Sequence, residues 1–291
     1  MKIAIASGKG GTGKTTLSTN LSALLSEQMP VGQQVVLTDL DVEEPNSGVF
    51  VNGELVHEEE KFKNIPEVHF DACTFCGRCK EVCHFNAIAT LPNNVLIFPE
   101  LCHSCNACVG LCPEDAMSMK PHKIGDLKEF QQKNLRFVEA RLKIGEQQAV
   151  PLIHQAIEYG TEHYNHEDVF IYDAPPGTSC PVIESVKDAD FVILVSEPTP
   201  FGLHDLKLSV ATMQKMGKSF GVVINRDGIG EDIIGGYCSE EEIPLLGRIP
   251  NLREIANLYA RGAYIFQLES VEKALNHIIE SIEKQTAKNM R

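Results

Sequence analysis

Short apolar runs recur along the chain and predict the strands of a buried parallel sheet. These runs are rich in Val and Ile, and they cover Ile3–Ala6, Val35–Leu37, Val169–Tyr172, Phe191–Val195 and Gly221–Ile224. Continuous apolar runs of this length are typical of parallel strands that are covered on both faces. Between most of them, as in residues 15–25 and 206–216, apolar side chains fall on one helical stripe. The alternation of strand and helix predicts a doubly wound α/β sheet.

The segment from about residue 59 to residue 121 breaks this rhythm, because it is dense in cysteine and has no long helical pattern. Within it, Cys73–Ala87 and Cys102–Ala116 superimpose at an offset of 29 residues, and each reads C-x2-C-x2-C-x3-C-x3-A. The segment therefore contains an internal duplication. Structureless loops of this length are uncommon inside compact domains. We expect residues 59–121 to form a domain inserted into an α/β domain made of residues 1–58 and 122–291.

Composition and charge narrow the class of protein. The chain has 291 residues, 43% of them hydrophobic, and its 26 basic and 40 acidic side chains give a formal charge of -14. This acidity disfavours binding to nucleic acid or to anionic lipid. The N-terminus resembles no signal peptide, and no apolar run approaches the length of a membrane span. We therefore expect a cytoplasmic protein, in which cysteines serve as metal ligands rather than in disulfides.

A glycine-rich loop follows the first predicted strand. Residues 8–15 read G-K-G-G-T-G-K-T, which satisfies G-x4-G-K-[ST], and a helical pattern begins at once. The glycines let consecutive backbone N–H groups face phosphates, and the helix N-terminus adds the positive end of its dipole. We expect Lys14 to reach the β- and γ-phosphates and the Thr15 hydroxyl to ligate Mg²⁺. The residues predicted to bind the phosphates are Gly8, Lys9, Gly10, Gly11, Thr12, Gly13, Lys14, Thr15 and Thr16.

The second lysine of this loop, Lys9, gives the sequence K-G-G-T-G-K-T. This sequence resembles the deviant Walker A motif of the superfamily that contains MinD, ParA, Mrp and the nitrogenase iron protein. The resemblance implies ATP as the nucleotide and a sheet of seven or eight mostly parallel strands. It also implies an ATP-bound homodimer in which Lys9 reaches the nucleotide of the partner subunit. The alternative is that Lys9 is only a solvated charge.

Acidic residues follow one of the predicted strands at its carboxyl end. Asp39 and Asp41 lie in the run D-L-D-V-E-E-P-N, which resembles switch I of this superfamily. The resemblance implies that Asp41 orients the attacking water and that Asp39 lies near the metal. Phosphoryl transfer needs mainly an in-line water and neutralised charge, so one aligned carboxylate suffices. The predicted catalytic residues are Lys9, Lys14 and Asp41.

Later strand ends supply the remaining nucleotide-site residues. Asp173 opens the run D-A-P-P-G-T, which resembles Walker B and switch II. The resemblance implies that Asp173 holds Mg²⁺ through water and that Gly177 offers its N–H to the γ-phosphate. Asn225 is similar to the adenine-reading asparagine, and Pro250 resembles the loop beside the adenine. Turn formation is the alternative role for Asp173 and Asn225. The predicted Mg²⁺ residues are Thr15, Asp39 and Asp173.

Two C-x2-C-x2-C-x3-C runs contain eight of the ten cysteines. The spacing is typical of ferredoxins with two [4Fe-4S] clusters, in which the fourth cysteine of each run binds the other cluster. We therefore expect the first cluster on Cys73, Cys76, Cys79 and Cys112. We expect the second cluster on Cys83, Cys102, Cys105 and Cys108. Zinc is the alternative, but zinc sites seldom have three cysteines at successive two-residue gaps.

Three further positions in or near these motifs stand out. His84 replaces the proline that follows the fourth cysteine in bacterial ferredoxins, whereas Pro113 keeps it, so we expect some loss of rigidity but intact ligation. Cys238 is predicted to be an inert apolar residue. Cys180 has the same default role. It follows the predicted switch II, however, so a symmetric pair of these thiols could hold a transferable cluster or metal in a dimer.

Nearly the whole chain resembles MinD/Mrp-type ATPases with an inserted ferredoxin domain, including the segment E-P-T-P-F-G-L at residues 197–203. The favoured function is ATP-gated electron transfer to an unidentified redox or client protein. The alternatives are an ATP-dependent carrier of iron-sulfur clusters or metal, and a MinD-like positioning or regulatory ATPase with redox-sensing clusters. No membrane anchor is expected, because the apolar stripe of the last helix is predicted to pack in the core.

The cysteine-rich segment begins shortly after Asp41 and Asn46. The predicted γ-phosphate sensor and the predicted redox domain are thus neighbours along the chain. We expect ATP binding and dimerisation to reorient the clusters toward a partner, and hydrolysis to reset them.

Overall fold

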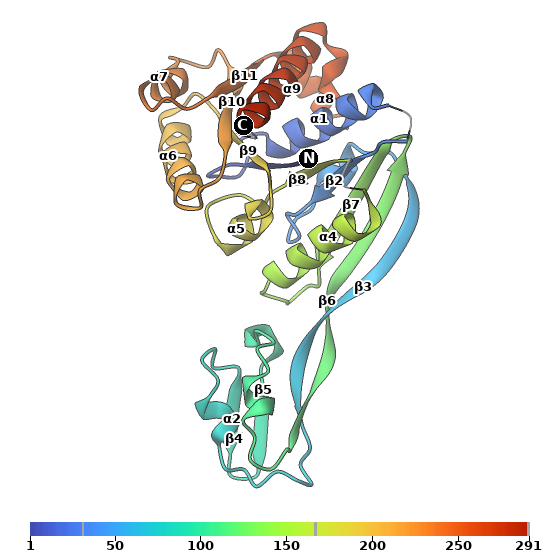
Figure 1. The fold of residues 1–291 in the computed structure, drawn as a ribbon, viewed down its shortest axis with the longest axis vertical. Coiled ribbons are helices and arrows are strands. Elements are labelled where there is room, and N and C mark those ends of the chain that lie inside the picture. The colour runs from blue at the N-terminus through green and yellow to red at the C-terminus, as the bar shows by residue number, and fades with distance from the viewer. Residues whose placement is uncertain (31, 166–167, 290–291) are drawn as a thin grey trace.

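A nine-stranded sheet forms the centre of the computed structural model, which describes residues 1–30, 32–165 and 168–289 (Figure 1). Its strand order is β11-β10-β9-β1-β8-β2-β7-β6-β3. Neighbours from β11 to β7 are parallel, whereas β6 and β3 are antiparallel additions. The strands are β1 (Lys2–Ala6), β2 (Val35–Asp39), β3 (Glu54–Val68), β6 (Met117–Gln132), β7 (Leu135–Leu142), β8 (Val169–Asp173), β9 (Phe191–Ser196), β10 (Phe220–Asp227) and β11 (Leu245–Pro250).

Helices cover both faces of the sheet, which confirms the doubly wound α/β class. One buried cluster joins the sheet to α4 (Val150–His163), α5 (Cys180–Val186), α6 (Pro200–Lys215) and α7 (Ile233–Glu240). The opposite cluster joins it to α1 (Lys14–Gln28), α8 (Arg253–Tyr259) and α9 (Glu269–Asn289). Successive strand residues point to opposite faces, so Ala4 belongs to the first cluster and Ile3 and Ile5 to the second.

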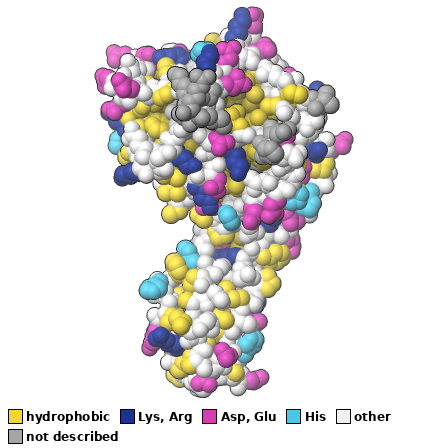
Figure 2. Space-filling model, viewed as in Figure 1, with side chains coloured by type: hydrophobic (Ala, Val, Ile, Leu, Met, Phe, Trp, Pro, Cys, Tyr) yellow, Lys and Arg dark blue, Asp and Glu magenta, His cyan; other side chains and the backbone are white. Residues whose placement is uncertain are grey.

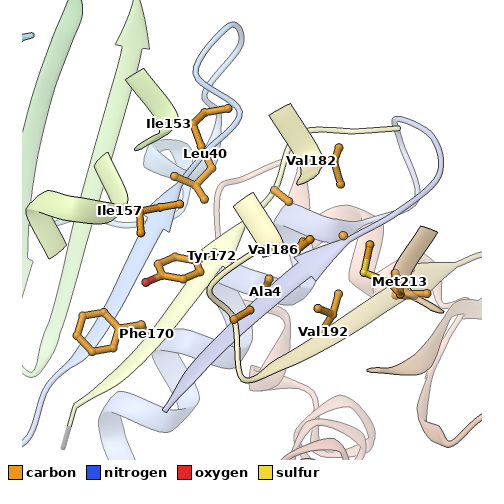
Figure 3. Close-up of a cluster of buried hydrophobic side chains, with 14 of the residues drawn as sticks. Ala4, Leu40, Ile153, Ile157, Phe170, Tyr172, Val182, Val186, Val192 and Met213 are labelled. Atoms are coloured by element: carbon orange, nitrogen blue, oxygen red, sulfur yellow. The ribbon is translucent and has the colours of Figure 1, made fainter. Parts of the chain in front are cut away.

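The first cluster is drawn in Figure 3, where side chains of β1, β8 and β9 meet those of α4, α5 and α6. The labelled residues are Ala4, Leu40, Ile153, Ile157, Phe170, Tyr172, Val182, Val186, Val192 and Met213. The apolar stripe of α9 lies in the second cluster, so its predicted role in core packing is confirmed. Among the described residues, no helix has both the length and the apolar content needed to cross a membrane.

Two of the strands, β3 and β6, extend beyond the rest of the sheet. Leu142, the last residue of β7, pairs with Gly125, and from there β3 and β6 continue as an antiparallel ribbon to Val68 and Met117. Figure 1 shows this ribbon leaving the body of the protein with a smaller unit at its far end. The predicted boundaries at residues 58/59 and 121/122 therefore fall inside continuous strands. The sheet has nine strands rather than the expected seven or eight, because the antiparallel β6 and β3 are added to seven parallel strands.

Residues 69–116 form the small unit, called here the cysteine module. It contains the hairpin β4 (Ile88–Leu91) and β5 (Asn94–Ile97) and the one-turn helices α2 (Arg78–Glu81) and α3 (Ala107–Gly110). The duplication in the sequence is also a duplication in structure, since α2 and α3 stand 29 residues apart. Left-handed backbone recurs at the same offset, in the pairs Phe75 and Ser104, Gly77 and Asn106, and Asn86 and Asp115.

Three short 3-10 turns complete the described structure. They are η1 (Ser47–Val49), η2 (Pro99–Leu101) and η3 (Ile265–Gln267). The first follows the predicted switch I, and the second immediately precedes Cys102.

Candidate functional site

A cavity of about 500 Å³ opens at the carboxyl ends of the parallel strands. Ligands of open α/β sheets bind at this edge. Its walls come from the loop between β1 and α1 with the first turn of α1, the segments after β2 and β8, the carboxyl ends of β10 and β11, and helix α8. Nine of the predicted residues line it: Gly10, Gly11, Gly13, Lys14, Thr15, Thr16, Asp41, Asn225 and Pro250.

The phosphate loop is held in shape by close contacts that only glycine allows. Gly13 has a φ of +95°, and a Cβ there would lie 2.1 Å from Nδ2 of Asn225. That amide donates a hydrogen bond of 2.8 Å to the carbonyl of Thr12. The side chain predicted to read the base is thus packed directly against the loop predicted to bind the phosphates.

Lys14 is buried within this loop, and its Nζ donates to the Ser7 hydroxyl at 3.0 Å. Burial lowers the pKa of Lys14, while Asp173 and Asp41 act in the opposite direction. A cation enclosed with little solvent interacts strongly with an anion placed beside it. The lysine is therefore preorganised for a phosphate group.

Two buried aspartates lie side by side behind the loop. Both oxygens of Asp39 accept backbone N–H groups, from Asp41 at 3.1 Å and from Asn46 and Ser47 at 3.0 and 2.9 Å. The Ser47 hydroxyl donates to Oδ2 of Asp173 at 3.2 Å, but Oδ1 of Asp173 is buried without a hydrogen-bond partner. Burial raises the pKa of both carboxyl groups, and their mutual repulsion raises that of Asp39 further.

This arrangement fits a hard divalent cation such as Mg²⁺, which prefers oxygen ligands. Its two positive charges would balance the negative charges of the two adjacent carboxylates. The unpartnered oxygen of Asp173 is the observation that fits best. The neighbouring Thr15 and Ser18 hydroxyls lower the pKa of this carboxyl group. The residues that could hold the cation are thus Thr15, Asp39 and Asp173.

Some predicted residues take other positions. Gly177 donates its N–H to the Ser7 carbonyl at 3.0 Å. Lys9 forms an ion pair with Glu197 of its own chain, and Glu197 also accepts from Arg226 at 3.1 Å. The predicted contact of Lys9 with a partner subunit would require the Glu197 pair to open.

Several residues of the site were not predicted from the sequence. Ser47 bonds to both Asp39 and Asp173, and Glu197 forms an ion pair with Lys9. Tyr259 of α8 lines the cavity, and the centroid of its ring lies 4.9 Å from that of Phe50. Glu197 was visible in the segment E-P-T-P-F-G-L, but its partners follow from the fold. Ser47 and Tyr259 carry no motif at all.

The cysteine module contains two cavities, each with four cysteines in its wall. Cys73, Cys76, Cys79 and Cys112 line the first. Cys83, Cys102, Cys105 and Cys108 line the second. Each cavity thus takes three cysteines from one run and the fourth from the other, and these are the sets that the spacing predicts for two clusters.

The surroundings of these cysteines suit metal-bound thiolates. Ala87 and Ala116, which occupy matching positions in the two repeats, donate their N–H groups to Cys83 and Cys112 sulfurs at 3.3 Å each. Val68, Val95 and Met117 supply apolar walls to the first cavity. Burial in such surroundings disfavours free thiolates. A bound metal would supply the positive charge that stabilises them.

The two solitary cysteines differ in environment. Cys238 is buried in the core, and burial raises its pKa to about 11, as expected for an inert thiol. Cys180 is exposed at the first residue of α5.

A strand–loop–helix phosphate site with acidic residues at neighbouring strand ends defines a P-loop nucleotide-binding protein. Residues 3–265 match the CobQ/CobB/MinD/ParA nucleotide binding domain, and the chain belongs to this family of P-loop ATPases. The fold agrees with this assignment. MinD of Pyrococcus horikoshii, solved with Mg-ADP, has 20% identity and a TM-score of 0.59 over 97% of this chain and 96% of its own. MinD of Aquifex aeolicus, solved in complex with MinC, has 16% identity and a TM-score of 0.60 over 98% and 96%.

Relatives in sequence include an uncharacterized protein of Methanocaldococcus jannaschii, MJ0578, 33% identical over 79% of both chains. An iron-sulfur cluster carrier protein of Pyrococcus horikoshii is 25% identical over 86% of this chain and 73% of its own. A ferredoxin of Alicyclobacillus acidocaldarius is 38% identical over 63 residues, which are 22% of this chain and 81% of the ferredoxin.

Proposed function

We propose that this protein is an Mg²⁺-dependent ATPase that acts as a dimeric switch and gates electron transfer to a partner protein. In this proposal residues 59–121 form an inserted ferredoxin domain with two [4Fe-4S] clusters. The observation that carries it is the pair of four-cysteine cavities, built by exchange of one cysteine between the repeats, at the end of a ribbon continuous with the ATPase sheet.

The nucleotide half of the proposal assigns roles within the large cavity. Lys14 and the backbone of the phosphate loop bind the phosphates, and Asp41 positions the attacking water. Mg²⁺, held by Thr15 with Asp39 and Asp173, would neutralise charge on the phosphates. The base lies toward Asn225 and Pro250, beside α8. Gly177 is proposed to turn its N–H to the γ-phosphate once ATP is bound.

The dimer is proposed to form when Lys9 leaves Glu197 and reaches the nucleotide of a second subunit. In the single chain this lysine is already paired, and Glu197 is only 13% exposed. Release of Lys9 thus costs an ion pair, and the phosphates of a bound nucleotide offer a replacement with higher charge. ATP would therefore favour the dimer over the free chain.

The cluster half rests on the chemistry of the cysteine cavities. The two-residue gaps within each cysteine run support multi-iron clusters over zinc, as does the similarity to a ferredoxin. The clusters would supply one-electron carriers. Cys76 and Cys105 are exposed, one in each set, so both clusters would lie near the surface.

The surface of the cysteine module supports a protein partner. Phe70, Phe85 and Leu111 are 51%, 40% and 51% exposed. Figure 2 shows hydrophobic side chains spread over the visible face of this unit, with acidic, basic and histidine side chains between them. Exposed apolar side chains gathered on one small unit are typical of docking surfaces.

Cys180 supports a second candidate function, an ATP-dependent carrier of clusters or metal. Its thiol is exposed directly after the predicted switch II, and one relative is an iron-sulfur cluster carrier protein. In that case the Cys180→Ala variant would lose delivery of iron to an apo-acceptor. The electron-transfer proposal expects Cys180→Ala to leave bound iron and partner reduction unchanged.

Anaerobic purification followed by iron and sulfide analysis tests the proposal. We expect about eight iron atoms per chain, and reoxidation of the dithionite-reduced protein by an electron acceptor that is faster with Mg-ATP. Lys14→Ala should remove the ATP effect and keep the iron. Reoxidation that is indifferent to ATP would refute gated electron transfer, and bound zinc without iron would refute the cluster assignment.

A further inference from the structure

The ribbon that carries the cysteine module leaves the sheet at one defined point. Gly125 pairs there with Leu142, and the register between β3 and β6 shifts between Lys61 and Phe62. A Cβ on Gly125 would lie 2.4 Å from the Arg141 carbonyl oxygen, so β6 and β7 approach unusually closely. Because β7 runs parallel to β2, this point lies at the same edge of the sheet as the nucleotide cavity.

The segment between β7 and α4, residues 143–149 and called here the exit loop, holds the ribbon at this point. Lys143 donates its backbone N–H to the Ile124 carbonyl at 2.8 Å. Glu146 accepts from Nζ of Lys63 in β3 at 2.8 Å, and both side chains are only 3% exposed. The second oxygen of Glu146 lies 3.5 Å from Nε2 of His122 in β6. One carboxylate thus contacts both strands of the ribbon.

The exit loop also touches the cysteine module itself. Nε2 of Gln148 donates to the carbonyl of Glu100 at 3.1 Å. Glu100 lies in η2, two residues before Cys102, whose sulfur lines the second cysteine cavity. Close by, the Ser104 hydroxyl donates to the Asn64 carbonyl of β3 at 2.6 Å. The exit loop is therefore hydrogen-bonded to the module two residues from the wall of the second cavity.

The exit loop is also connected, through the end of β7, to the predicted switch I. Leu142 donates its backbone N–H to the Val42 carbonyl at 2.7 Å, and Nη2 of Arg141 donates to the Pro45 carbonyl at 3.4 Å. Val42 directly follows Asp41, which lines the nucleotide cavity. Adjacent residues, Leu142 and Lys143, thus bond to the switch and to the ribbon. One pair of adjacent residues therefore links switch I to the exit loop and to the ribbon.

We propose that the exit loop transmits the nucleotide state of switch I to the cysteine module, with Glu146 and Gln148 as its contact residues. The proposal rests on the proposed function, because it requires switch I to respond to nucleotide, and it names the route of that response. A buried ion pair is costly to break and leave open. The loop and the ribbon therefore move together, and the second cysteine cavity shifts relative to the body.

Hydrogen–deuterium exchange of the full-length protein tests this route, with and without Mg-AMPPNP. In the wild type we expect protection to change by at least about fivefold, the lower end of ordinary coupling, in three places: residues 8–16, the exit loop and residues 99–105. In Glu146→Gln and Gln148→Ala the change in 8–16 should persist, whereas the change in 99–105 should be lost. Gln148→Ala keeps the buried Lys63–Glu146 ion pair, and at Lys63 it removes only a longer contact of 3.4 Å to the Gln148 side chain. It therefore keeps the test valid if Glu146→Gln folds poorly.

The matched control is Glu67→Gln. Glu67 pairs with Lys120 across the same ribbon at 2.9 Å, but this pair is exposed and lies away from the exit loop. We expect Glu67→Gln to behave as the wild type at all three places. Protection in 8–16 without any change in the exit loop would overturn the route alone, and so would an unchanged module response in Gln148→Ala. Absence of protection in 8–16 would overturn the proposed function and the route together.

Discussion

Alanine replacements in the phosphate loop should have graded effects on stability, because three of its glycines have different surroundings. A Cβ on Gly10 would meet no atom within 4 Å, and its φ lies outside the left-handed region. Gly11 has the same open space but a φ of +78°. Gly13 has a φ of +95°, and its Cβ would lie 2.1 Å from Nδ2 of Asn225. The series therefore separates backbone strain from steric conflict.

The structure sets the size of each step. Gly10→Ala should leave the free energy of unfolding unchanged or raise it by about 0.4–1 kcal/mol, because alanine restricts the unfolded chain. Left-handed backbone costs a non-glycine residue about 1–2 kcal/mol, so Gly11→Ala should be destabilising by that amount. Gly13→Ala carries the same strain and must also displace Asn225 from the Thr12 carbonyl. A buried polar group left unpaired costs about 1–3 kcal/mol, which gives about 2–5 kcal/mol in total.

Urea unfolding without nucleotide, followed by circular dichroism, measures this order. Affinity for a fluorescent ATP analogue is then measured separately, because any added methyl group can also obstruct the phosphates. We expect Gly13→Ala to lose the most affinity, since it moves the side chain predicted to face the base. Equal destabilisation by Gly10→Ala and Gly13→Ala would refute the reasoning, and so would an unfolding midpoint of Gly13→Ala that matches the wild type.

Three further substitutions test other parts of the molecule. Glu146→Gln removes the ionic partner of the buried Lys63 and should lower the free energy of unfolding by about 3–5 kcal/mol. The exposed control Glu67→Gln should lower it by only about 0–1 kcal/mol. Equal losses of stability for the two variants in urea unfolding would contradict the burial argument. Cys112→Ser should halve the bound iron, from about eight atoms to about four per chain. The control Cys238→Ala should keep all of the iron. Loss of both clusters in Cys112→Ser would contradict the view that the two cavities bind their clusters independently. Asp173→Asn removes a buried charge with an unpartnered oxygen, so it should raise the free energy of unfolding without nucleotide by about 1–3 kcal/mol. The same variant should lose Mg²⁺-dependent ATP hydrolysis. Unchanged hydrolysis would exclude the proposed metal role.

The central strands could be predicted from the sequence because they are buried on both faces. All five predicted runs lie within β1, β2, β8, β9 and β10. The strands β3 and β6 were not predicted. Most side chains of β3 are exposed along its first half, where the sequence reads H-E-E-E-K, so no apolar face marks it as a strand. An edge strand of this kind is defined by its pairing with β6, which lies far along the chain.

The site residues also divide into those that local spacing predicts and those that only the fold reveals. Residues within one motif, such as Lys14 and Thr15, were predicted from local spacing, and the structure brings them to one cavity. The sets of cysteines also follow from local spacing, because the duplication fixes the relation between the two runs. Contacts such as that of Lys9 with Glu197 join residues that are far apart in sequence. Spacing carries no information about such pairs.

The position of the cysteine module relative to switch I shows why sequence proximity alone is a poor guide to coupling. Along the chain, Asn46 reaches the module only through the full length of β3, whose 15 residues span about 50 Å at about 3.3 Å each. Along that path β3 is hydrogen-bonded to β6, so a local movement at its start is resisted by the sheet. Through contacts, Val42, Leu142, Lys143 and Ile124 connect switch I to the base of the ribbon. Gln148 then connects the exit loop to Glu100 of the module. The expected coupling between nucleotide and clusters therefore depends on the loop after β7, which no motif in the sequence identifies.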